Sequence, residues 1–85
     1  MSISGLIAEL NGIKTGSDDL SKLILGAAQN LQTQSTDLMK VGQGKGSAEA
    51  AAKHVLKASK SLNDAAACLR TLTGDISNVI SEIKR

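Results

Sequence analysis

The stretch that decides the fold is "VGQGKGSAEAAAK", residues 41–53, at the middle of a chain of 85 residues. Its glycines precede an alanine-rich run. Glycine most easily ends a helix in a left-handed cap, and we expect Gly42 to do so here. Ser47 suits the N-cap of a following helix, and Glu49 in its first turn suits the helix dipole. The stretch therefore predicts a bend between two helices. The predicted bend residues are Gly42, Gly44 and Gly46.

A phosphate-binding loop is the tempting alternative, because a lysine stands among these glycines. Such a loop needs a glycine, four residues and then Gly-Lys-Ser/Thr, on a turn that leaves a strand. Here Lys45 is followed by Gly46, the spacing does not match, and no strand pattern precedes the stretch. We therefore expect no nucleotide binding.

Apolar residues recur on both sides of the bend at steps of three and four residues, and we call these positions the three–four stripe. In the first half the stripe is Ile3, Leu6, Leu10, Ile13, Ser17, Leu20, Ile24, Ala27, Leu31, Gln34, Leu38 and Val41. In the second half it is Ala48, Ala51, Val55, Ala58, Leu62, Ala65, Leu69, Leu72, Ile76, Val79 and Ile83. This spacing is typical of a helix that packs on another helix.

The stripe predicts two helices, over about residues 3–41 and 47–84. At about 1.5 Å per residue each is roughly 55–60 Å long. A short connection makes long helices antiparallel neighbours. The predicted fold is all-α, an antiparallel two-helix hairpin forming a single domain over residues 1–85, with the stripe as the contact between its helices.

Two segments inside the predicted helices also resemble loops followed by helix starts: "KTGSDD" (14–19) and "LTGDIS" (72–77). Continuous helices are favoured, because an inserted loop shifts the phase of the stripe and neither segment does. Gly16 and Gly74 fall at about the same level of the hairpin. A close approach of the two backbones there, or a break at one of the glycines, stays open.

A chain of this length buries too little apolar surface for a robust core, and small domains usually need a disulfide, a metal or a partner. The single cysteine, Cys68, and the single histidine, His54, exclude an internal disulfide and an ordinary zinc site. Association with another chain is therefore the expected source of stability.

Further apolar residues lie beside or outside the stripe, and a stripe with one flank is the wide apolar face of a bundle helix. We expect a helical partner to cover them and complete a four-helix bundle. The predicted partner interface is Ile7, Leu23, Leu25, Ala28, Met39, Ala52, Leu56, Ala66 and Ile80.

No arrangement of side chains points to catalysis, a cofactor or a metal, and we expect no enzymatic activity. His54 has no carboxylate or serine aimed at it, so a solvated or interface histidine is expected. Cys68 is expected to be a small interface hydrophobe, with an intermolecular disulfide as the alternative. Lys53, Lys57 and Lys60 form a basic stripe of the solvated kind, and the chain has no aromatic residue on which nucleic-acid bases could stack.

The charge and hydropathy patterns argue against two further classes of partner. Ten basic and eight acidic residues nearly balance, which gives no electrostatic reason for a polyanion. The apolar runs are too short to span a bilayer, so no membrane insertion is expected. The opening "MSISGLIAEL" lacks the basic start and long apolar stretch of a signal peptide. Any export is expected to follow a route that does not read such a signal.

The chain resembles the WXG superfamily, the small helical hairpins of bacterial type VII secretion. The resemblance covers nearly the whole chain, with two long helices of similar length and, in "VGQGKGSAEAAAK", a glycine-containing bend before small residues. The motif is partial, since the tryptophan is absent and Val41-Gly42 or Gln43-Gly44 stands in its place. The tyrosine-containing export signal is absent too.

Within that superfamily the chain is most similar to the accessory hairpins that accompany LXG toxins. The resemblance implies binding to the helical N-terminal domain of a secreted toxin or to a paralogous hairpin, and contact with the secretion ATPase through that complex. It implies a bacterial cytoplasmic protein that is then secreted without a signal peptide. Some members carry an aromatic-xxx-acidic motif, but at the nearest spacing here, Thr71 to Asp75, the aromatic is missing.

Two other classes stay open. Needle or filament subunits of other secretion systems are also hairpins of about this size and finish near an arginine, here Arg85. Their bend usually bears proline and asparagine, whereas this bend is rich in glycine. The alanine-rich "AAAKHVLKASKSLNDAAACL" (51–70) also has the texture of a cytoskeletal helical bundle.

Overall fold

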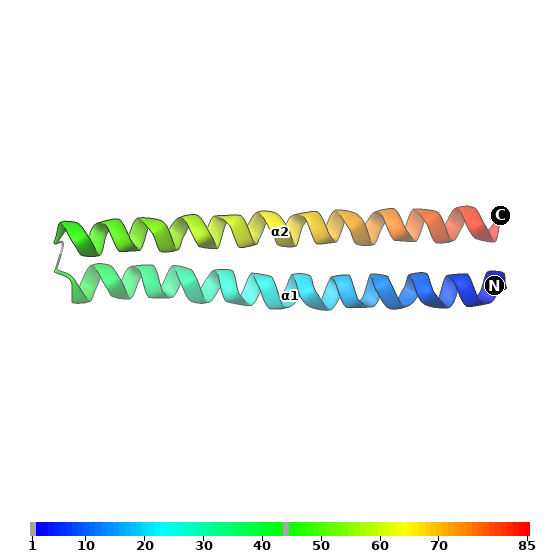
Figure 1. The fold of residues 1–85 in the computed structure, drawn as a ribbon, viewed down its shortest axis with the longest axis horizontal. Helices are drawn as coiled ribbons and strands as arrows, with labels where there is room; N and C mark the ends of the chain where they lie inside the picture. Colours follow the sequence, from blue (N-terminus) through cyan, green and yellow to red (C-terminus); the bar gives the residue numbers. More distant parts are fainter. Residues whose placement is uncertain (1, 44) are drawn as a thin grey trace.

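The computed structural model describes residues 2–43 and 45–85, which form two long helices packed side by side (Figure 1). Helix α1 spans Ile3–Val41 and helix α2 spans Gly46–Lys84, each of 39 residues. Within the described ranges there is no strand. The molecule is a rod of 61 × 14 × 14 Å, and both chain ends lie at the end opposite the bend. The predicted antiparallel two-helix hairpin is therefore confirmed.

Both helices are continuous over their full length, as the unbroken phase of the stripe predicts. Helix α1 begins after Ser2, whose hydroxyl accepts a hydrogen bond of 3.0 Å from the Gly5 backbone N–H. Gly16 and Gly74 lie inside the helices, and a Cβ added at either would meet no atom within 4 Å. The expected alternatives of a break or a close backbone approach at these glycines are therefore wrong.

The bend is tight, and its conformation differs from the prediction at Gly42. Gly42 has a right-handed φ of −75°, while the left-handed conformation, φ 52°, falls on Gln43. A Cβ at Gly42 would collide with the side chain of Ala48 and lie 2.9 Å from the carbonyl oxygen of Leu38. Gly42 is therefore required for the space it leaves and not for a positive φ.

The start of α2 is also displaced slightly from the prediction. Lys45 occupies the N-cap with an extended backbone and makes no side-chain capping bond, so the prediction of Ser47 as N-cap is wrong. Gly46 is the first helical residue, and Gly44 lies outside the described residues. Glu49 does lie in the first turn, and its carboxylate is 3.5 Å from the Lys53 ammonium.

Neither helix has a stretch long and apolar enough to cross a membrane, in the part of the chain that the structure describes.

Candidate protein interface

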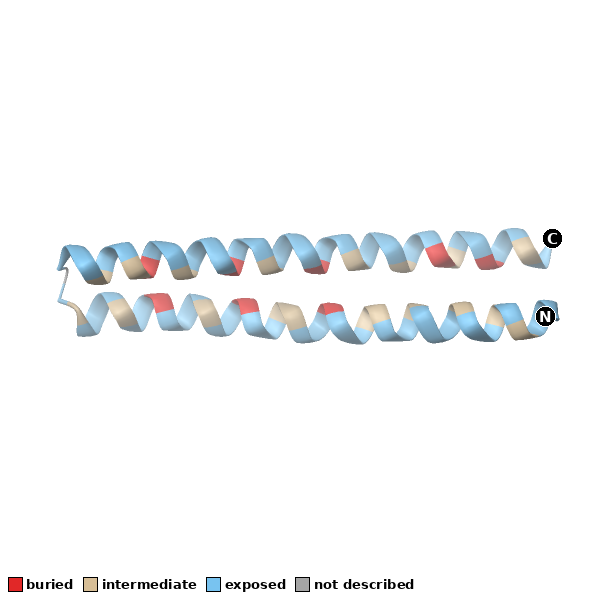
Figure 2. Ribbon diagram, viewed as in Figure 1, coloured by how far each residue is buried: buried red, intermediate tan, exposed pale blue. Residues whose placement is uncertain are grey.

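The two helices contact each other through rows of small residues spaced seven apart. In α1 the fully covered positions include Ser21, Ala28 and Ser35. In α2 they include Ala52, Ser59 and Ala66. Figure 2 shows these buried residues as bands on the sides of the helices that face each other. Side chains of this size let two helices approach closely, because little volume stands between the backbones.

Two serines show directly how close the helices are. The Ser59 hydroxyl donates a hydrogen bond of 2.8 Å to the backbone carbonyl of Ala28 on the other helix. The Ser35 hydroxyl likewise donates to the carbonyl of Ala52, at 3.1 Å. A side chain with one heavy atom beyond Cβ reaches the opposite backbone only where the helices are in tight contact. The close approach that glycine does not provide is thus provided by serine and alanine.

These bonds also fix the register of the hairpin. Each step of seven along α1 is matched by a step of seven back along α2. The same register brings Ser21 level with Ala66, Lys14 level with Thr73, and Ile7 level with Ile80. We call these rows the contact line. The contact line comprises Ile7, Lys14, Ser21, Ala28 and Ser35 of α1, with Ala52, Ser59, Ala66, Thr73 and Ile80 of α2.

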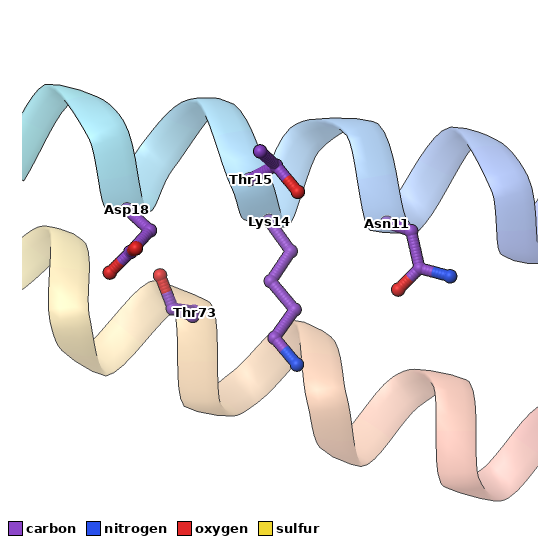
Figure 3. A pocket seen from close by; sticks show the side chains of 5 residues that line it. All are labelled: Asn11, Lys14, Thr15, Asp18 and Thr73. Atoms are coloured by element: carbon purple, nitrogen blue, oxygen red, sulfur yellow. The ribbon is translucent and has the colours of Figure 1, made fainter.

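One level of the contact line is polar and leaves a shallow depression. Lys14 extends across it toward α2, beside Thr73 (Figure 3). The depression has a volume of about 450 Å³ and is also lined by Asn11, Thr15 and Asp18. Asp18 is instead paired within its own helix, 3.2 Å from Lys22. The described residues contain no cluster of potential metal ligands. The Thr73 hydroxyl donates a hydrogen bond of 3.0 Å to the backbone carbonyl of Leu69.

The contact line corrects the sequence prediction that the three–four stripe is the contact between the helices. Only one half of the stripe lies beside the contact line and is partly covered; we call it the inner rows. The inner rows are Ile3, Leu10, Ser17, Ile24, Leu31 and Leu38 with Ala48, Val55, Leu62, Leu69, Ile76 and Ile83. Among them Ile76 is buried, and Ile3, near the chain end, is exposed. In the other half, each member is followed directly by a residue of the contact line, or by Gly42 in the case of Val41, and is therefore turned away from the contact. This half points outward, because the helices meet most closely where side chains are small.

The displaced half forms what we call the outer rows, all exposed except the half-covered Ala51. The outer rows are Leu6, Ile13, Leu20, Ala27, Gln34 and Val41 with Ala51, Ala58, Ala65, Leu72 and Val79. An antiparallel pair has an approximate two-fold axis normal to the plane of its two helix axes. Equivalent rows of the two helices therefore lie on the same side of that plane. Inner and outer rows together make one continuous surface, the open face.

The open face gathers most of the exposed bulky apolar side chains of the molecule. Of the ten exposed large hydrophobic residues in the described ranges, seven belong to the stripe: Ile3, Leu6, Ile13, Leu20, Val41, Leu72 and Val79. Ile13 is 55% exposed and Leu20 is 48% exposed. No position of the stripe carries a charge. Scattered apolar residues on a surface are normal, but a charge-free face of this length makes the open face a candidate interaction surface.

The predicted partner interface is divided by the structure. Four of its residues, Ala28, Ala52, Ala66 and Ile80, are buried between α1 and α2, so the expectation that a partner covers them is wrong for this hairpin. Ile7, on the contact line, and Leu25 are half-buried, while Leu23, Met39 and Leu56 are exposed. The reason is that each helix is rotated relative to the prediction: the small residues of the contact line face the other helix, and the outer rows of the stripe face away from it.

Three of the exposed or half-buried leucine and methionine residues lie away from the open face. Leu25, Met39 and Leu56 each stand four residues after a member of the contact line, which places them on the opposite side of the hairpin. Leu23 points outward from α1. The sequence signal for the contact line is the seven-residue spacing of serine and alanine. The apolar stripe is the more conspicuous pattern, and the sequence prediction follows the stripe instead.

The remaining candidate residues lie at the surface. His54, Lys53, Lys57 and Lys60 are all exposed, as expected for a solvated face. Cys68 is a free, exposed thiol and takes no part in the contact between the helices.

Comparison with known proteins identifies no relative of this chain. No family model, curated protein or solved structure matches the chain.

Proposed function

We propose that this hairpin is a non-enzymatic binding module that covers its open face with the helices of another protein. The observation that carries the proposal is the open face itself, which holds seven of the ten exposed large hydrophobic residues in the described ranges and carries no charge at its stripe positions. Complete burial of a fully exposed side chain of this kind is worth about 1.5–3 kcal/mol, and covering the fraction that these residues still expose, from 39% at Leu6 to 83% at Val41, contributes a corresponding share to association. Helices suit the face, because its side chains follow helical rows that another helix can mesh with.

The biological role that we propose follows from the resemblance to type VII secretion hairpins. The partner is the helical N-terminal domain of an LXG-type toxin, or a paralogous hairpin, and the complex forms a four-helix bundle. This chain then acts as a targeting factor and chaperone, holding the toxin domain as a rod that the secretion ATPase can accept. It works first in the bacterial cytoplasm and is then secreted without a signal peptide. This assignment rests on size, hairpin architecture and the glycine-containing bend.

Co-expression with the neighbouring gene products, followed by affinity capture of this chain, tests the role. We expect a helical neighbour to be retained by the wild-type chain. Leu72→Gln should release it, because Leu72 lies on the open face at 40% exposure. Leu56→Gln is the matched control, since this leucine is in the same helix at 47% exposure but on the opposite side. Retention of no neighbour, or equal loss with both variants, would contradict the proposal.

A further inference from the structure

We propose that the helices that cover the open face carry lysine or arginine along the borders of their own apolar stripe. This inference rests on the proposed function, because it names the chemistry of the partner that the same face accepts. Two observations on the described residues lead to it: the sign of the charges that border the open face, and the place of the ion pairs within the hairpin.

The open face has two long edges, and we call the residues along them the edge rows. Each member stands two residues after a member of the contact line, which places it beyond the outer rows at the border of the open face. All members are exposed. The edge rows are Glu9, Gly16, Leu23, Asn30 and Asp37 of α1, with His54, Ser61, Cys68, Asp75 and Glu82 of α2. Where two helices pack, residues that border the apolar stripe meet the border of the other helix, and their charges select the partner.

The charges of the edge rows are all negative. The rows hold four carboxylates, and neither row holds a lysine or an arginine: the carboxylates are Glu9, Asp37, Asp75 and Glu82. The chain as a whole has ten basic residues against eight acidic ones. The acidic borders therefore reflect where charges are placed on the hairpin and not how many charges of each sign the chain has.

The basic residues gather on the side of the hairpin opposite the open face, which we call the back. Positions one, four and five residues after a member of the contact line lie there, with the same seven-residue repeat. The basic residues of the back are Lys22, Lys40, Lys53, Lys57, Lys60, Arg70 and Lys84. Its acidic residues are Asp18, Asp19, Glu49 and Asp64. Seven basic and four acidic side chains give the back a net charge of +3, in contrast to the purely acidic borders of the open face.

The ion pairs of the hairpin also lie on the back. Asp18 is 3.2 Å from Lys22, and Glu49 is 3.5 Å from Lys53. Among the described residues, no carboxylate of the edge rows takes part in an ion pair. A partner that covers the open face removes water from beside these carboxylates, which is unfavourable unless a cation replaces that water. The edge rows therefore favour a partner that brings cations with it.

Three of the four edge carboxylates border the bulkiest part of the open face. Glu9 lies on the edge of α1, and Asp75 and Glu82 lie on the edge of α2, near exposed Leu6 and Val79. Asp75 and Glu82 are seven residues apart, which is about 10.5 Å along a helix. The partner helix beside α2 is therefore expected to carry its lysines or arginines at the same seven-residue spacing.

A second copy of this chain does not supply these cations. The borders of its open face carry the same four carboxylates and no lysine or arginine. Like charges that meet across an interface are unfavourable and suppress the wrong partner. The borders of the open face therefore select a different chain, with basic borders, over a copy of this one.

Two synthetic helical peptides test the borders directly. Both carry leucine at three–four spacing over about 40 residues, which at 1.5 Å per residue spans the rod. One peptide has lysine at the two positions that border its leucine stripe, and the other has glutamate there. Fluorescence anisotropy of the labelled peptides, titrated with the full chain, measures both dissociation constants. We expect the lysine-bordered peptide to bind about tenfold more tightly or better at about 0.15 M salt, and the difference to shrink at about 1 M salt, where charges are screened.

Charge reversal at the edge should remove this preference. In the double variant Asp75→Lys and Glu82→Lys, we expect the two peptides to bind equally, or the glutamate-bordered one to bind better. The matched control is Asp19→Lys with Asp64→Lys, which changes the net charge by the same amount at exposed positions of the back. The control should keep the preference within about threefold of wild type, because screening over about 8 Å weakens charges on the far side of the rod. Circular dichroism checks that the helices persist in both variants.

Three results would overturn the inference. The first is that the wild type binds the glutamate-bordered peptide as tightly as the lysine-bordered one, or more tightly. The second is that it binds neither peptide. The third is that the edge variant and the back variant change the preference equally.

The two proposals fail separately. A chain that captures a helical neighbour through Leu72 but shows no preference between the peptides removes the basic borders and leaves the proposed function intact. A chain that prefers the lysine-bordered peptide through its edge carboxylates but captures no neighbour does the reverse.

Discussion

The Ser59 hydroxyl on α2 donates a hydrogen bond of 2.8 Å to the backbone carbonyl of Ala28 on α1. This bond, and the equivalent one from Ser35 to Ala52, draws the two helices together along a row of small side chains. The larger apolar residues are thereby turned toward one side of the hairpin, where only another molecule can cover them. The open face is thus a consequence of how closely the helices pack.

Enlarging Ser59 should destabilise the hairpin, because the buried site has no room for a larger side chain. We expect Ser59→Leu to lower the free energy of unfolding by about 2–3 kcal/mol, and Ser59→Ala, which removes only the hydrogen bond, by about 1 kcal/mol. Ser61→Leu is the control, since Ser61 is exposed two residues away. Urea unfolding followed by circular dichroism measures all three. Equal stability of Ser59→Leu and Ser61→Leu would mean that the helices are farther apart than the hydrogen bonds indicate.

Gly42 should not tolerate a side chain, because a Cβ there would collide with Ala48. Gly42→Ala is expected to lower the free energy of unfolding by about 1–3 kcal/mol through displacement of the bend. At Gly46 the same Cβ meets no atom within 4 Å. Gly46→Ala should therefore be neutral or slightly stabilising. The difference between the two melting curves is the measurement, and a harmless Gly42→Ala would contradict the bend geometry.

Alanine at the glycines inside the helices should stabilise the protein. Gly16 and Gly26 lie in α1, and a Cβ at either meets no atom within 4 Å. Because glycine in a helix is less favourable than alanine by about 0.5–1 kcal/mol, each substitution should raise the free energy of unfolding by about that amount. Thermal unfolding of Gly16→Ala, Gly26→Ala and the double variant measures the gain. A loss of stability at Gly16 would indicate a packing role that the structure does not have.

The polar residues Lys14 and Thr73 on the contact line should lower the free energy of unfolding of the hairpin. Lys14 is half-buried there beside Thr73, and a polar residue at such a position lowers stability while it fixes the register. Lys14→Leu is expected to raise the free energy of unfolding by about 1 kcal/mol, because it places an apolar side chain at this half-buried position. Lys22→Leu is the control, because its exposed pair with Asp18 is worth little. Destabilisation by Lys14→Leu alone would show that the lysine holds the register through a necessary contact.

Much of this fold follows from the sequence. The unbroken stripe predicts both helices, and the bounds at Ile3–Val41 agree with the prediction while α2 begins one residue earlier. Whether the stripe faces the other helix or the solvent could not be predicted in the same way. Periodicity shows which residues share a face of one helix, but it does not say whether that face meets the other helix or a different molecule. That choice depends on the small residues of the contact line and the hydrogen bonds that Ser35 and Ser59 make there.

The conformation of the bend was also beyond the sequence pattern. Glycine at the end of a helix indicates a left-handed cap, but it serves equally where space is short. At Gly42 the side chain of Ala48 lies so close that there is no room for a Cβ, and the left-handed conformation is adopted by Gln43. A contact between residues on opposite sides of a bend is visible only in three dimensions.

Hydroxyl-radical footprinting of the assembled protein tests most directly whether the open face is the covered one. Oxidation rates of leucine and isoleucine side chains report their exposure without any substitution. In the free hairpin Ile13 and Leu72 should react at rates similar to Leu56, in line with their exposure. In the assembly with a helical partner, Ile13 and Leu72 should be protected while Leu56 stays reactive. Protection of Leu56 with continued reactivity of Ile13 and Leu72 would contradict the account.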